Sequence, residues 1–99
     1  MKIVGIQGDL LIVKIDKLPE EAKSREGKVL VFGEATGHAH RLVEGNVYEA
    51  DDRILFTVPF QTEIIHEEHH PLPIVEKGTY EIIRQKEYKN KDMTALVVD

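Results

Sequence analysis

Short segments in which apolar and polar residues alternate occupy most of this chain, and each ends at Gly, Pro or Asp. A period of two indicates half-buried β-strands, and turns about every 8–12 residues are typical of a small barrel or sandwich. We therefore expect an all-β fold of eight or nine strands, with residues 1–99 forming a single domain. Only residues 17–27 break the pattern. Pro19 can begin a helical turn there, so we predict a surface loop or a short helix.

The expected strands follow the alternation directly. They cover residues 2–6, 9–15, 28–32, 36–43, 47–50, 54–58, 62–66 and 79–88, with residues 95–98 closing the sheet or fraying. Tight turns are expected at Gln7-Gly8, at residues 44–46 and at Asp51-Asp52.

The amino-acid composition excludes several classes of function. The 99 residues contain no Cys, which excludes disulfides, thiolate metal sites and Cys nucleophiles. The net charge of −5 disfavours nucleic-acid binding. No segment has the length of a membrane span or the character of a signal peptide, so we expect a cytoplasmic protein. The charged fraction of 31% with few Asn and Gln is typical of a thermophile. A chain this small gains from a metal or a partner subunit, which favours a homo-oligomer.

All five histidines fall in two short clusters, one with His38 and His40 and one with His66, His69 and His70. Histidine is the commonest metal ligand and titrates nearest neutral pH. Two clusters with acidic neighbours predict one composite site, formed where distant strands meet. In a strand, His38 and His40 share a face, about 7 Å apart at the Cα atoms, and their rings can converge on one ion.

The segment that carries His38, His40 and Glu44 after Gly33 resembles the first motif of the cupin barrels. That resemblance implies a divalent metal held by His38, His40 and Glu44, with one histidine from a second motif. The chain departs from the pattern because one residue is missing between Gly33 and His38. The second motif is also rearranged, with its histidines before Pro73.

The second cluster contains H-E-x-x-H, from His66 to His70. As a zinc-protease motif it requires a helix, and here a predicted strand precedes it and Pro71 follows it, which argues against a protease. We predict His38, His40, His66 and His69 as metal ligands, with His70 outside the set. Glu67 or Glu68 is then a fifth ligand, a residue that orients a ring, or a catalytic general base.

The chain is also similar to small uncharacterised prokaryotic proteins that pair a GEATGHxHR segment with a downstream HEEHxPL segment. That resemblance supports a shared site and implies no activity.

Three functions remain open. The first is a metal-dependent enzyme acting on a small molecule, with Zn, Fe, Mn, Ni or Co as the ion. The second is a non-enzymatic module in which histidines hold a structure or a subunit interface together. The third is a pH-sensitive or anion-binding surface without a metal.

Overall fold

The computed structural model describes residues 2–32 and 37–85, and every element in these residues is a β-strand. The strands are β1 (Lys2–Gln7), β2 (Leu10–Ile15), β3 (Lys23–Arg25), β4 (Val29–Phe32), β5 (Ala39–Leu42), β6 (Asn46–Ala50), β7 (Arg53–Val58), β8 (Thr62–Ile65), β9 (Leu72–Ile74) and β10 (Gly78–Arg84). The all-β prediction is confirmed. The start of the strand expected at 36–43, the end of that expected at 79–88, and the strand expected at 95–98 lie outside the described residues.

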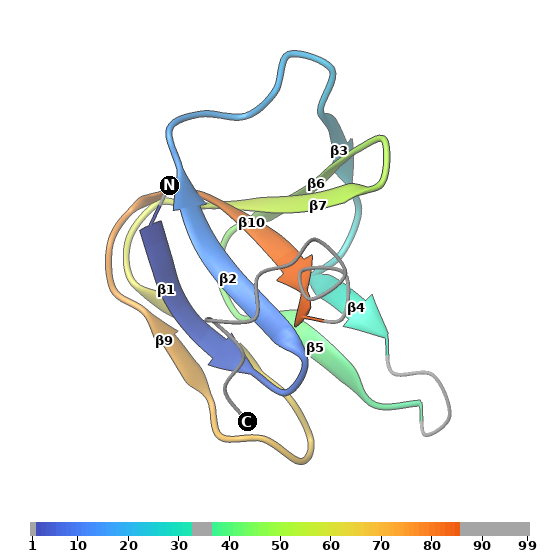
Figure 1. The fold of residues 1–99 in the computed structure, drawn as a ribbon, viewed down its shortest axis with the longest axis vertical. Helices are drawn as coiled ribbons and strands as arrows, with labels where there is room; N and C mark the ends of the chain where they lie inside the picture. The colour runs from blue at the N-terminus through green and yellow to red at the C-terminus, as the bar shows by residue number, and fades with distance from the viewer. Residues whose placement is uncertain (1, 33–36, 86–99) are drawn as a thin grey trace.

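Two antiparallel sheets form a sandwich, not a closed barrel (Figure 1). One sheet has six strands in the order β1-β2-β10-β7-β6-β3, and the other has four in the order β4-β5-β8-β9. The edge strands β1 and β9 lie side by side (Figure 1). At this seam, a Cβ on Gly5 would lie 2.6 Å from Leu72 Cδ1, so glycine permits the close approach of the two sheets.

Two-residue turns set the register of the main hairpins. Gln7 pairs with Leu10, so the β1–β2 turn consists of Gly8 and Asp9, one residue later than predicted. Gly8 has a φ of 60°, which glycine adopts without strain at the first central position of a hairpin turn. The shift keeps Gln7 inside β1. The predicted turn at Asp51-Asp52 joins β6 to β7.

Residues 17–27 form a loop, the first of the two predicted alternatives, and the loop contains β3. The amide of Ala22 donates to the carbonyl of Pro19, which closes a single turn before β3 pairs with β6. The prediction missed β3 and β9. Both are three-residue edge strands, where charged residues and prolines such as Pro73 are tolerated.

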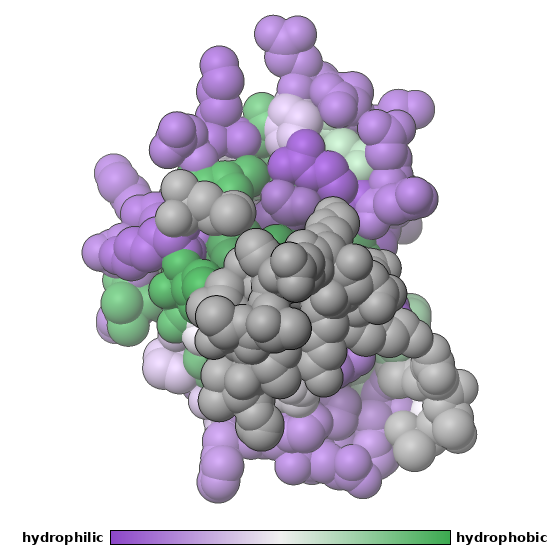
Figure 2. Space-filling model, in the orientation of Figure 1, coloured by the Kyte–Doolittle hydropathy of each residue, from purple (hydrophilic) through white to green (hydrophobic). Residues whose placement is uncertain are grey.

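The core fills the space between the sheets. Its members are buried residues from both sheets, including Leu10, Ile12, Leu30, Leu42, Val47, Ile64 and Ile74, with the stacked rings of Phe56 and Tyr80 5.1 Å apart. Burying each large side chain contributes about 1.5–3 kcal/mol. Outside, the face in Figure 2 is largely hydrophilic at both ends, with a hydrophobic patch over β1 and β9. In the described part of the chain, no helix is long and apolar enough to span a membrane.

Candidate functional site

Four imidazole rings from the two histidine clusters lie together. His38 and His40 lie just before and within β5, and His66 and His69 follow β8. The ring centroids of His40 and His66 are 4.3 Å apart, and those of His66 and His69 are 4.6 Å apart. The centroids of His38 and His66 are separated by 5.7 Å, and those of His40 and His69 by 6.0 Å. The two clusters therefore meet, as the sequence predicts.

A buried amide from the opposite sheet fixes the orientation of one of these rings. Gln7, only 3% exposed at the end of β1, donates from Nε2 to the carbonyls of Ile64 and His70, each at 2.9 Å. Because Nε2 faces two carbonyl oxygens, the amide cannot be flipped without losing both bonds. Its Oε1 then accepts a hydrogen bond from His40 Nδ1 at 2.8 Å. His40 therefore carries its proton on Nδ1 and a lone pair on Nε2.

His40 is also held in its neutral form. The residue is 5% exposed, and this burial, followed by the nearby His66, lowers the pKa of His40 from 6.5 to about 4. The ring is therefore uncharged at neutral pH. A neutral imidazole with one nitrogen hydrogen-bonded and the other unprotonated is the form that binds a metal ion.

Glu67 connects the segment that carries His66 and His69 to strand β5 through two hydrogen bonds. Its Oε1 accepts the backbone amide of Ala39 at 3.0 Å, and its Oε2 accepts a hydrogen bond from Arg41 Nη1 at 2.9 Å. These bonds, with the Ala39 amide as the largest cause, lower the pKa of Glu67 from 4.5 to about 2. A carboxylate with so low a pKa is a weak base near neutral pH. Its two hydrogen bonds suit a structural role, in which Glu67 holds the segment after β8 against β5.

Glu68 contacts two of the imidazoles. Its backbone amide donates to His66 Nδ1 at 3.0 Å, so neutral His66 carries its proton on Nε2. The Glu68 carboxylate lies 3.5 Å from His38 Nδ1 and is largely exposed. For His66 to bind an ion through Nδ1, this amide contact has to open. The predicted catalytic roles of Glu67 and Glu68 remain predictions.

Gly8 brings the β1–β2 turn against two of the rings. A Cβ at this position would lie 2.8 Å from His69 Nε2 and 3.4 Å from His40 Cε1. Gln7, Gly8 and Arg41 thus support the site, although no motif in the sequence predicts them as part of it. The sequence signal at these positions is the Gln-Gly dipeptide, which predicts a turn.

Among the described residues, His38, His66 and Glu67 form a set whose possible ligand atoms all lie within 4.8 Å of one another. Ligand atoms on one tetrahedral ion at 2.0–2.1 Å are about 3.4 Å apart, so this set would have to close by roughly 1.4 Å. His40 and His69 lie outside this set, although their rings adjoin His66. Nitrogen and carboxylate ligands together suit Zn, Fe, Mn, Ni or Co.

His70 and Glu44, the two other residues considered as ligands from the sequence, both lie away from the clustered rings. His70 is exposed and reaches the site through its backbone carbonyl, the acceptor of Gln7. Glu44, the glutamate implied by the cupin resemblance, follows the far end of β5, where its amide donates to Thr62 Oγ1 at 2.8 Å. His38 and His40 lie at the opposite end of that strand.

Fold and site together define a small β-sandwich with clustered histidines at the junction of its two sheets. The chain belongs to the family described as a domain of unknown function, DUF8820, whose model matches residues 6–85. This range includes Gln7 and both histidine clusters. No curated protein and no solved structure matches the chain significantly. The family description assigns no activity, so a functional argument has to come from the site.

Proposed function

We propose that this protein binds one divalent transition-metal ion at the histidine cluster. The observation that carries the proposal is the Gln7–His40 hydrogen bond, which leaves a buried, neutral imidazole with its lone pair on Nε2. Metal-binding histidines characteristically donate their second N–H to a fixed oxygen acceptor. A buried histidine without such a role is more simply replaced by an apolar residue.

The ion is bound by His38, His40, His66 and His69 in this proposal, with Zn, Fe, Mn, Ni or Co as candidate metals. His40 is the rigid member, because burial and Gln7 hold its ring. His66 is half-buried and His69 is exposed, so these rings can turn towards a common centre. Glu67 holds the segment in place and is the alternative oxygen ligand in the set with His38 and His66.

Elemental analysis of untagged protein and titration with Co²⁺ test the proposal. We expect one equivalent of metal, and d–d absorption bands from the Co²⁺-loaded protein that report imidazole coordination. His40→Ala and His66→Ala should each lower the affinity at least tenfold, as expected for the loss of one ligand. His70→Ala is the matched control, since only its backbone carbonyl contacts the site. Protein that takes up none of the five metals refutes the proposal.

Exposure of part of the cluster favours a second version, in which a second copy of the chain completes the coordination. His69 and Glu68 both lie at the surface. A shared ion at such a surface would link subunits and stabilise the fold together. Light scattering with and without a chelator separates the versions: a dimer that dissociates on chelation supports the shared ion, and a metal-bound monomer contradicts it. In a monomer, an ion that takes more than four ligands retains an open position for water or a small molecule, and the enzymatic hypothesis depends on that position.

A further inference from the structure

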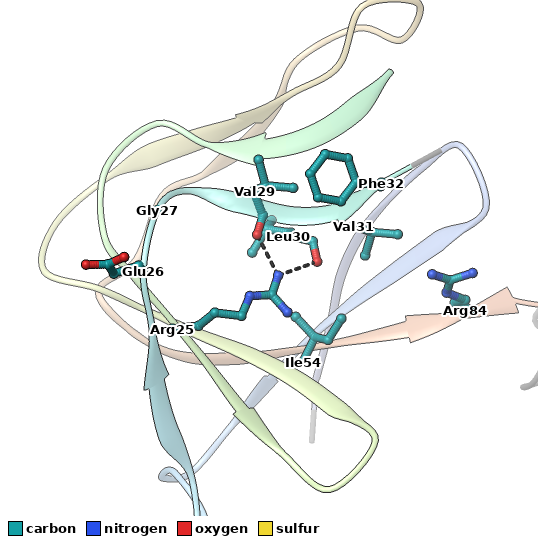
Figure 3. A pocket seen from close by; sticks show the side chains of 9 residues that line it. All are labelled: Arg25, Glu26, Gly27, Val29, Leu30, Val31, Phe32, Ile54 and Arg84. Atoms are coloured by element: carbon teal, nitrogen blue, oxygen red, sulfur yellow. Dashed lines mark hydrogen bonds between the residues drawn. The ribbon is translucent and has the colours of Figure 1, made fainter. Parts of the chain in front are cut away.

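A hollow opens between the sheets, and none of the described residues that line it belongs to β1 or β9. It has a volume of about 570 Å³ and is lined by parts of β3, β4, β7 and β10 (Figure 3). A smaller hollow of about 320 Å³ adjoins it and shares Val31, Ile54 and Arg84. Volumes of roughly 300–1,000 Å³ are typical of sites for small organic ligands.

The walls of this pocket are mainly apolar. Leu30 and Val31 are buried members of the core, Ile54 packs against it, and Phe32 is 65% exposed at the rim. Such walls suit the hydrocarbon part of a ligand, because covering them removes apolar surface from water.

Two arginines line the pocket, and they differ in their existing partners. Arg25 Nη2 already donates to the carbonyls of Val29 and Leu30 (Figure 3). Its Nη1 also lies 3.5 Å from Glu49 Oε1. Arg25 therefore completes the hydrogen bonding of β4. The side chain of Arg84, in contrast, has no hydrogen bond or ion pair with any residue in the described part of the chain. Its guanidinium offers five N–H donors to an acceptor in the pocket.

The register explains why Arg84 lies at the pocket. Arg84 pairs with Leu10, and Ile82 of the same strand belongs to the core, so Arg84 continues the inward face of β10. Leu10 also pairs with Gln7, which puts Gln7 and Arg84 two strands apart, about 10 Å at the Cα atoms. The pocket is thus a separate site on the same end of the six-stranded sheet as the histidine cluster.

We propose that this pocket binds a small apolar monocarboxylate whose carboxylate is received by Arg84. A planar guanidinium matches a carboxylate in two parallel hydrogen bonds, and the apolar walls take the rest of the molecule. A ligand with a single negative charge fits this pocket better than a doubly charged phosphate, because Glu26 and Asp52 line the two hollows and the chain as a whole carries a charge of −5. The proposal is independent of metal binding.

Calorimetric titration of the full chain with octanoate tests it, and 1-octanol serves as the uncharged probe. We expect octanoate to bind with one-to-one stoichiometry, and 1-octanol to bind at least tenfold more weakly. Arg84→Gln should weaken octanoate binding about ten- to hundredfold, the range for losing a charged hydrogen-bonded pair. Arg53→Gln is the matched control, because Arg53 lies outside the pocket and is already paired with Glu81.

A variant that fills the pocket, Ile54→Trp, keeps the test decisive if Arg84→Gln does not fold. This variant should abolish octanoate binding while Arg84 is retained. Absence of octanoate binding, equal binding of octanoate and 1-octanol, or unchanged binding by Arg84→Gln would each overturn the proposal. Tighter binding of inorganic phosphate than of octanoate would also overturn it.

Discussion

Replacing Gln7 by leucine tests how the two sheets are joined at the site. The substitution keeps the approximate volume and removes three hydrogen bonds, to Ile64 O, His70 O and His40 Nδ1. Each hydrogen bond contributes about 1 kcal/mol net, and more where the remaining partner stays buried. We therefore expect the free energy of unfolding to fall by about 3 kcal/mol. For a domain of this size each kcal/mol shifts Tm by about 4–8 °C, so Tm should fall by roughly 12–24 °C.

Urea denaturation followed by circular dichroism measures this change, with Gln61→Leu as the control. Gln61 is exposed, so its replacement should change the free energy of unfolding by less than about 0.5 kcal/mol. An unchanged m-value would show that only native-state stability has altered. A loss below about 1 kcal/mol for Gln7→Leu, or one equal to that of the control, would refute the assigned role of the amide.

Three further predictions concern the same site. The pKa of His40 in the folded protein, about 4, lies below the 6.5 of the unfolded chain. Neutral His40 therefore stabilises the fold fully above about pH 6.5, and up to about 3 kcal/mol of the free energy of unfolding is lost as the pH falls towards 4. In His40→Gln, the free energy of unfolding should not show this dependence on pH. Gly8→Ala should lower the free energy of unfolding by about 1–2 kcal/mol because of the positive φ, and further because the added Cβ would contact His69. Gly27→Ala is the control, since Gly27 has a positive φ and open space around it. Equal losses of thermal stability in the two variants would contradict the contact with His69. Glu67→Ala, which removes the acceptor of the Ala39 amide, should speed hydrogen exchange at that amide, as measured by NMR; unchanged exchange would contradict the role of Glu67 in joining the two segments.

The strands of the core could be read from the sequence because their alternation reflects burial. Leu10 and Ile12 face inward on β2, and Tyr80 and Ile82 do so on β10, as a period of two requires. The edge strands β3 and β9 could not be read in this way. Lys23 and Pro73 are residues that usually interrupt strands, and they are accommodated here because each edge strand pairs on one side only.

Part of the site could be read as well. Histidine clustering predicted that residues near His38 and His66 meet, because side chains that bind one ion have to lie together in the fold. Gln7 could not be found, since two of its partners are the backbone carbonyls of Ile64 and His70, which leave no mark in the sequence. The one-residue error at the β1–β2 turn hid it further, because a shift of one residue reverses the face of a strand.

The most direct test of metal binding at the histidine cluster is a long-range ¹H–¹⁵N correlation spectrum of the imidazoles, recorded at neutral pH during a Zn²⁺ titration. Before Zn²⁺ is added, His40 should show protonated Nδ1 and unprotonated Nε2. One equivalent of Zn²⁺ should shift the Nε2 resonance of His40 and the ligating nitrogens of His66 and its neighbours, while Nδ1 of His40 stays protonated. A His40 ring with its proton on Nε2, or imidazole resonances that ignore Zn²⁺, would contradict the account.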